Sequence, residues 1–118
     1  MADELRPLVW CGTSKRDFAA FPKEVQRDMG YALFVAQTGE SHRKAKILKG
    51  FGGGVVEVRE SRDGNAYRAV YTFRFADAIY VLHAFQKKSK TGAETPKPDI
   101  ALIERRLKAL VAEKGRPR

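Results

Sequence analysis

Hydrophobic and polar positions recur with different periods along the chain, and each change of period marks a predicted element. The apolar run from Arg6 to Cys11 predicts a short strand, which Gly12 ends. Ser14 fits the N-cap of a brief helix, with Asp17 three residues later completing a capping box. A second helix is predicted to begin at Pro22, a residue that suits the first helical turn. The chain is therefore expected to begin with a strand and an αα-hairpin.

The second predicted helix carries a single apolar face. Its apolar residues are four, four and three positions apart, the spacing of one helical side: Val25, Met29, Leu33 and Ala36. Gly39 is suited to a left-handed C-cap. A basic, glycine-rich connector covers residues 41–54. Its glycines lack the spacing and the Lys-Ser/Thr ending of a phosphate-binding P-loop, so we expect a turn that leads into a strand.

From Val55 the period changes to two, which is typical of half-buried strands. Asp63-Gly64 is a hairpin turn signal, and Ala76-Asp77 predicts a second turn. Residues 79–85 are apolar at almost every position, as expected of a central strand with helices on one side. In the middle strand the alternation predicts one face made of Tyr67, Ala69, Tyr71, Phe73 and Phe75 and an opposite face made of Arg68, Val70, Thr72 and Arg74.

A last helix is predicted from Pro98 and Asp99 to Gly115, with an apolar stripe at Ile100, Ile103, Leu107, Leu110 and Val111. The predicted fold class is α+β: an N-terminal strand and αα-hairpin, an antiparallel three-stranded meander and a C-terminal helix. At 118 residues the chain is expected to form a single domain over residues 1–118.

Composition adds a strong positive charge to this picture. The chain has 23 Lys+Arg against 14 Asp+Glu, a net charge of +9, which favours a polyanionic partner such as RNA or DNA. Cys11 is the only cysteine, so neither an intrachain disulfide nor a thiolate metal site can form. We expect a cytoplasmic protein without a membrane span or signal peptide. No metal or cofactor is expected.

The arginines of the meander are candidates for phosphate chemistry. RNA cleavage without a metal requires removal of the 2′-hydroxyl proton, stabilisation of a doubly charged phosphorane and protonation of the departing 5′-oxygen. Arg59 and Arg68 project from adjacent predicted strands, and guanidinium groups can grip two phosphate oxygens at once. Arg68 is expected to point away from the main core. The alternative is that each arginine is a surface residue paired with Glu57 or Glu60.

The end of the last strand supplies further candidates. His83 is the only strand histidine, and imidazole suits proton transfer, although a structural histidine is the alternative. Lys87 and Lys88 leave the strand on opposite faces, so we expect one of them to hold a phosphate; the alternative is a solvated charge run. Tyr71 could stack on a base, but core packing is favoured. Further predicted nucleic-acid contacts are Arg43, Lys44, Lys46, Lys49 and Lys90.

The order of these elements resembles the RelE/ParE superfamily of bacterial toxins, and within it the phage-derived HigB-like branch of type II toxin–antitoxin systems. The similarity spans about residues 7–114, and its most specific motif is the Phe85-Gln86-Lys87-Lys88 run with the downstream Thr95-Pro96. The other motifs are Lys49-Gly50 with Gly52 and Gly54, Val55-Val56-Glu57-Val58-Arg59, Tyr67-Arg68-Ala69-Val70-Tyr71, Leu82-His83, Asp99-Ile100 and Arg105-Arg106-Leu107.

The resemblance implies a small toxin with a concave sheet that inhibits translation by cutting messenger RNA, commonly on the ribosome. It also implies a cognate antitoxin, typically a helix-turn-helix DNA-binding protein. Catalytic residues vary in this superfamily, and its ParE-like branch acts on DNA gyrase instead. A gyrase inhibitor and a catalytically inactive module that binds nucleic acid or antitoxin are therefore the alternatives.

Overall fold

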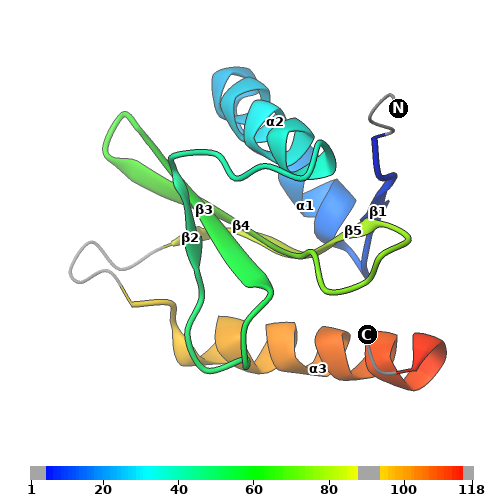
Figure 1. Cartoon of the computed structure of the whole chain (residues 1–118). Helices are drawn as coiled ribbons and strands as arrows, with labels where there is room; N and C mark the ends of the chain where they lie inside the picture. The colour runs from blue at the N-terminus through cyan, green and yellow to red at the C-terminus, as the bar shows by residue number, and fades with distance from the viewer. Residues whose placement is uncertain (1–4, 88–93, 116–118) are drawn as a thin grey trace.

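Five strands and three helices make up the protein in a computed structural model, which describes residues 5–87 and 94–115 (Figure 1). The strands form one sheet in the order β1-β5-β4-β3-β2. The α+β class and the meander predicted from the sequence are confirmed. The elements are β1 (Leu8–Trp10), α1 (Ser14–Ala19), α2 (Lys23–Gln37), β2 (Ala45–Ile47), β3 (Val55–Arg62), β4 (Asn65–Thr72), β5 (Ile79–Lys87) and α3 (Lys97–Lys114).

The meander β3-β4-β5 is extended by a short strand at each side. β1 pairs in parallel with the first residues of β5, from Ile79 to Val81. β2 pairs antiparallel with β3 and places Lys46 opposite Glu57. The prediction that the connector of residues 41–54 is only a turn is therefore wrong for its first half. Three residues between basic and glycine-rich segments are too few to show a period of two.

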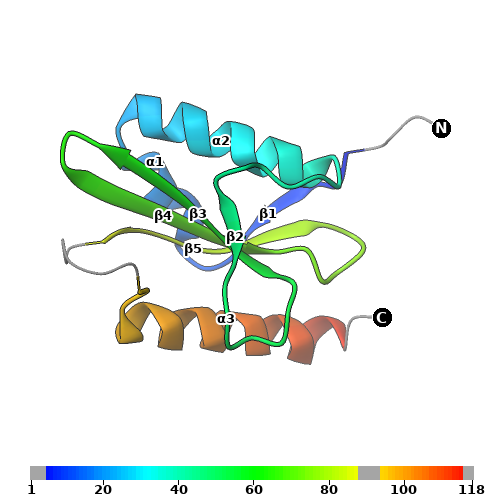
Figure 2. The same ribbon diagram turned by 60° about the vertical axis from the view of Figure 1, so that its left-hand side comes forward.

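Helices cover both faces of the sheet, not one face as the sequence suggested. Figure 2 shows α1 and α2 on one side and α3 on the other. The α2-side core contains the predicted apolar face of α2 together with Val56, Val58 and Ala69 of the sheet. The α3-side core contains Ile103, Leu107 and other residues of the predicted stripe. The near-continuous apolar sequence of β5 follows from this burial on both faces.

The predicted aromatic face of the middle strand is only half correct. Tyr67 and Tyr71 lie in the α2-side core, but β4 ends at Thr72. The Thr72 hydroxyl donates to the carbonyl of Gly54 at 2.7 Å, and the chain turns there. The alternation therefore stops, so Phe73 is 44% exposed and Phe75 packs in the α3-side core instead.

The predicted capping box at the first helix is wrong, whereas the glycine cap of the second helix is confirmed. Thr13, not Ser14, is the N-cap of α1, and its hydroxyl donates to the Asp17 carboxylate at 2.7 Å. Ser14 is buried and donates to the carbonyl of Val81. Gly39 has φ +92° after the C-cap of α2, and its N–H donates to the carbonyl of Ala36, as a left-handed helix end requires.

A β-bulge in β5 sets the position of the only strand histidine. Val70 pairs with His83, but the next residue of β4, Tyr71, pairs with Val81, so Leu82 is the extra residue. Leu82 packs in the α3-side core, as does Val70, whose partner His83 must share its face. The bulge thus directs two successive side chains toward α3.

Within the described ranges, none of the helices is both long and apolar enough to span a bilayer.

Candidate functional site

Charged side chains from three adjacent strands gather on the α3-side face of the sheet. Arg59 of β3 lies directly opposite Arg68 of β4, which in turn lies opposite Phe85 of β5. Side chains that face each other across antiparallel strands share a face and have Cβ atoms about 4.5–5.5 Å apart. Two like charges at this spacing repel, so the arrangement requires an anion between them.

Glu57 supplies that anion. Its side chain is 2% exposed, and its Oε1 accepts hydrogen bonds from Nε of Arg59 at 3.0 Å and from Nη1 of Arg68 at 3.3 Å. Its Oε2 accepts the hydroxyl of Thr95 at 2.8 Å, which links the segment before α3 to the sheet. One buried carboxylate therefore orients both candidate arginines and fastens the loop beside them.

The two arginines differ in their exposure to solvent. The Arg59 side chain is 42% exposed, whereas the Arg68 side chain is only 6% exposed. Arg68 lies on the face opposite the α2-side core, as predicted, but it is buried there. Its Nε is buried and has no hydrogen-bond partner among residues 5–87 and 94–115. Pairing of both arginines with Glu57 matches the alternative weighed from the sequence, except that Arg68 is not a surface residue.

His83 forms a dyad with the first turn of α3. Its Nε2 lies 2.7 Å from Oδ1 of Asp99, and its ring stacks on Phe85 with 4.6 Å between the ring centroids. A carboxylate only accepts hydrogen bonds, so the neutral imidazole carries its proton on Nε2 and leaves Nδ1 as an acceptor. That Nδ1 is buried and lacks a partner in the described part of the chain. Asp99, expected to serve only as a helix-start residue, therefore also orients the imidazole.

Of the predicted lysines near the end of β5, only Lys87 lies within the described residues. Lys87 is the last residue of β5, is 6% exposed and lies opposite Ala66, two positions from Arg68 on the same face. Its side chain therefore extends the charged face. Lys88 and Lys90, the other predicted phosphate contacts of this segment, lie outside the described residues.

A cleft of about 920 Å³ runs along the outer edge of β5. β1 covers that edge only as far as Val81, so no described strand pairs with the outer edge of the remainder of β5. Phe21 and Tyr67 line the cleft on the α2 side, and His83 and Asp99 line it on the α3 side. Arg59, Arg68 and Lys87 do not line it. These three residues share a sheet face with His83, but only His83 lines this cleft.

The predicted basic cluster of the connector is divided between the two faces of the sheet. Nζ of Lys44 pairs with Glu60 at 2.9 Å. Lys46 is exposed and lies opposite Glu57, which places its side chain on the charged α3-side face. Arg43 and Lys49 are exposed in the turns that flank β2. Lys46 can therefore add charge beside Arg59, whereas Lys44 is already neutralised.

Three polar residues that were not among the predicted catalytic or nucleic-acid-binding residues connect this site: Glu57, Thr95 and Asp99. A glutamate between two valines in a strand is the pattern of a solvent-facing position. A signal was nevertheless present, because Glu57 and Arg59 are two residues apart and so share one strand face. The contact between Thr95 and Glu57 joins residues 38 positions apart, which no local pattern encodes.

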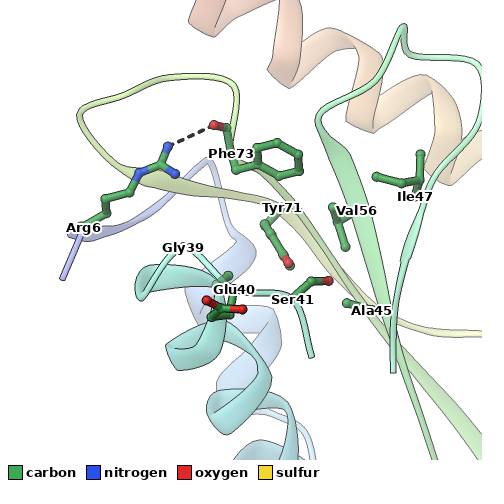
Figure 3. Close-up of a pocket in the computed structure, with 10 residues that line it drawn as sticks. Arg6, Gly39, Glu40, Ser41, Ala45, Ile47, Val56, Tyr71 and Phe73 are labelled. Atoms are coloured by element: carbon green, nitrogen blue, oxygen red, sulfur yellow. Dashed lines mark hydrogen bonds between the residues drawn. The ribbon is translucent and has the colours of Figure 1, made fainter. Parts of the chain in front are cut away.

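A separate cavity of about 410 Å³ lies on the α2-side face, between the end of α2 and the strands β2 and β3 (Figure 3). Ile47 and Phe73 expose apolar surface at this cavity, and Arg6 donates to the carbonyl of Phe73 at 2.9 Å. None of the predicted catalytic or nucleic-acid-binding residues lines it. Tyr71 lines it but is 2% exposed, so it packs in the core and is not placed to stack on a base.

Cys11, after β1, is not an activated nucleophile. Burial raises the pKa of its thiol above the ordinary value, and the charge of Arg106 opposes this shift only in part. A raised pKa keeps the thiol protonated near neutral pH, and a protonated thiol is a poor nucleophile.

The fold defines a small α+β protein with a mixed five-stranded sheet covered by helices on both faces. The chain belongs to the family Phage derived protein Gp49-like (DUF891), which matches residues 16–108. The phage-derived, HigB-like resemblance stated from the sequence is confirmed, and the chain is a toxin of the RelE/HigB type.

One solved structure resembles the chain at low identity. It is the toxin–antitoxin complex RelBE2 from Mycobacterium tuberculosis, with 19% identity and a TM-score of 0.47, covering 75% of this chain and 100% of that chain. No curated protein matches the chain.

Proposed function

We propose that this chain is the toxin of a type II toxin–antitoxin system and that it inhibits translation by cleaving messenger RNA on the ribosome without a catalytic metal. Membership of the Gp49-like family supports the toxin assignment. The observation that carries the chemistry is the pair of guanidinium groups held by Glu57, on the same sheet face as the His83–Asp99 dyad.

In the proposed reaction the 2′-oxygen of a ribose attacks the adjacent phosphorus. A P–O bond to the 2′-oxygen forms, the bond to the 5′-oxygen breaks, and a 2′,3′-cyclic phosphate and a 5′-hydroxyl result. The intermediate phosphorane carries two negative charges. The accessible guanidinium of Arg59 stabilises this charge, with Arg68 and Lys87 behind it on the same face. One such preorganised donor typically contributes about 2.7–4 kcal/mol to lowering the barrier.

Glu57 acts in this scheme as a positioning residue. It holds the guanidinium of Arg59 through a hydrogen bond from Nε. A fixed donor loses less entropy on meeting a phosphate than a mobile one. Thr95 completes the arrangement, because its bond to Glu57 keeps the segment before α3 against the sheet.

His83 is the proposed proton-transfer group. Asp99 fixes the tautomer in which Nδ1 is the acceptor, the state required to take the 2′-hydroxyl proton. Because Nδ1 is buried, the ring would have to be uncovered when RNA binds. The protonated ring, stabilised by the Asp99 carboxylate, would then return a proton to the 5′-oxygen. The imidazole lines the cleft at the edge of β5 and Arg59 does not, so the RNA would have to reach from this cleft to the charged face.

Phosphate affinity is assigned to further lysines. Lys46 is exposed and lies opposite Glu57 on this face, and Lys49 is exposed in the turn after β2. Lys88 and Lys90, which lie outside the described residues, are also proposed to contact RNA. Contacts of this kind are salt-sensitive and carry little sequence information. They would bring the messenger or ribosomal RNA to the site without choosing the cleaved linkage.

The partner that controls the toxin is proposed to be a helix-turn-helix antitoxin. The family supports an antitoxin, and the net charge of +9 favours a partner that is acidic where it touches the toxin. Co-expression with the product of an adjacent small gene should restore growth and give a complex that co-purifies.

A second candidate function is a non-catalytic module that binds nucleic acid or antitoxin. Its support is the burial of three proposed reaction groups, since Arg68, His83 and Lys87 are each only 5–6% exposed. Buried and paired charges of this kind also occur as purely structural networks.

Induced expression followed by pulse labelling separates these functions. The proposal predicts rapid arrest of protein synthesis and messenger RNA cuts phased with codons. A DNA-damage response with continuing translation would indicate a gyrase inhibitor, and normal growth would indicate the inactive module. Arg62→Ala is the matched control for Arg59→Ala, because both arginines lie on β3 and are similarly exposed.

A further inference from the structure

An exposed aromatic row lies on α2, the helix that Figure 2 shows on the side of the sheet opposite α3. Tyr31 is 59% exposed and Phe34 is 44% exposed, whereas the neighbouring residues Met29 and Leu33 face the core. The rings of Tyr31 and Phe34 stack with 6.3 Å between centroids and 27° between planes. His42, in the loop after α2, meets Tyr31 edge-on at 5.6 Å. Three rings therefore adjoin one another at the surface.

The third ring is held in place by the backbone. Nδ1 of His42 accepts the N–H of Lys44 at 3.1 Å, so the neutral imidazole carries its proton on Nε2. This bond fixes the turn that brings the connector against α2. The aromatic row is thus built from two segments of the chain and does not depend on one mobile side chain.

Cations surround the same place. A cavity of about 480 Å³ beside Tyr31 and His42 is also lined by Arg27, Arg43 and Lys44. Glu60 neutralises Lys44 at 2.9 Å, and Asp28 only approaches Arg27 at 3.8 Å, with 76% of the Arg27 side chain exposed. Arg43 is exposed and forms no ion pair with a residue in the described ranges.

We infer that this aromatic patch, made of Tyr31, Phe34, His42, Arg27 and Arg43, is a binding site for single-stranded RNA. Bases stack on the open faces of the two large rings, and the two arginines contact phosphates on either side. Stacking on aromatic faces beside a cationic track is the general mode of single-strand binding.

The chemistry of the patch favours RNA over a protein partner. Large exposed aromatic groups mark contact sites, and rings beside a cationic track are the arrangement of single-strand binding sites. Here Arg27 and Arg43 line the same cavity as Tyr31 and His42, and the chain as a whole carries +9. Since α2 covers the face opposite the Glu57 cluster, the patch is distinct from the proposed cleavage site and does not rest on it.

The test is fluorescence anisotropy with a dye-labelled 2′-O-methyl oligouridine, which cannot be cleaved because its 2′-oxygens are blocked. The double variant Tyr31→Ala/Phe34→Ala should weaken binding by roughly tenfold to a hundredfold, the range expected for loss of base stacking. The exchange variant Tyr31→Phe/Phe34→Tyr keeps both rings and should bind like the native chain. Phe73→Ala is the matched control, because Phe73 is also 44% exposed but lies outside the patch.

Arg59→Ala separates this inference from the proposed cleavage, since it should leave oligouridine binding within about twofold while RNA cutting is lost. Unchanged affinity in the Tyr31→Ala/Phe34→Ala variant, with its fold verified by circular dichroism, would overturn the inference. If this variant keeps its affinity for RNA but loses a protein that co-purifies with the native chain, the patch is a protein-docking surface and the inference is also overturned.

Discussion

Glu57 and Arg68 form an ion pair in the interior of the protein, with 3.3 Å between the carboxylate Oε1 and the guanidinium Nη1. The two residues lie on neighbouring strands, and both side chains are almost fully buried. The same carboxylate oxygen holds the exposed Arg59. The buried Glu57–Arg68 pair therefore also sets the direction of the exposed Arg59 guanidinium.

Removal of the accessible guanidinium should impair function without harming the fold. Arg59→Ala removes the proposed phosphorane contact, and kcat for RNA cleavage should fall about 100- to 1000-fold, or about 2.7–4 kcal/mol of barrier. Because the side chain is 42% exposed, the melting temperature should change little. Arg62→Ala should retain full cleavage. Equal activity of the two variants would remove Arg59 from the site.

Removing either partner of the buried Glu57–Arg68 pair should instead lower the free energy of unfolding. Arg68→Ala leaves the Glu57 carboxylate with one fewer donor in the interior, and Glu57→Gln leaves two adjacent arginines without their anion. Breaking a buried pair in this way costs about 3–5 kcal/mol, which urea unfolding can measure. A midpoint unchanged from the native chain would contradict the interior pairing. Arg68→Ala is accordingly a poor test of catalysis, because inactivity and unfolding would be confused.

The tautomer of His83 can be changed without removing the ring. Asp99→Asn can present an N–H in place of the carboxylate oxygen, so the histidine would be protonated on Nδ1 and lose its acceptor there. We expect kcat to fall by at least tenfold with KM little changed. The variant Asp99→Glu, which keeps a carboxylate, should recover part of the activity. If kcat falls in Asp99→Asn and circular dichroism also shows unfolding, the His83–Asp99 contact stabilises the fold and does not serve proton transfer.

A salt-linked cluster at the far end of α3 predicts a pH dependence of stability. Asp77 accepts hydrogen bonds from Lys114 at 2.9 Å and from Tyr80 at 2.7 Å, and these bonds lower the pKa of its carboxyl. A lowered pKa in the folded state stabilises the fold above the ordinary aspartate pKa and loses that contribution as the pH falls through the folded value. The melting temperatures of the native chain and Asp77→Asn should therefore differ at pH 6 and converge toward pH 2. A constant difference across this range would show that Asp77 acts through packing alone.

Much of the architecture is readable from local patterns, because period and turn chemistry are local. The spacing of Val25, Met29 and Leu33 and the Asp63-Gly64 turn were sufficient to predict α2 and the β3–β4 hairpin. β2 was missed because three residues carry no period. The end of β4 at Thr72 was missed because a hydrogen bond to Gly54, 18 residues away, stops the alternation.

Residue type singled out the candidate site residues, but the sequence did not predict their contacts. Arg59 and His83 stand out by residue type, and the alternation of β3 places Arg59 on an identifiable face. The bulge at Leu82, which turns His83 toward α3, leaves no mark in the sequence. Nor do the contacts of Glu57 with Thr95 or of His83 with Asp99, since each joins segments brought together only by the packing of α3 on the sheet.

The most direct measurement is the chemistry of the RNA ends produced by the purified protein on ribosomes that carry a defined messenger. Attack by a ribose 2′-oxygen predicts a 2′,3′-cyclic phosphate on the upstream fragment and a 5′-hydroxyl on the downstream fragment, with both ends formed about 100- to 1000-fold more slowly when Arg59→Ala replaces the native chain. Downstream fragments that begin with a 5′-phosphate, or a messenger that stays intact, would contradict the proposed cleavage.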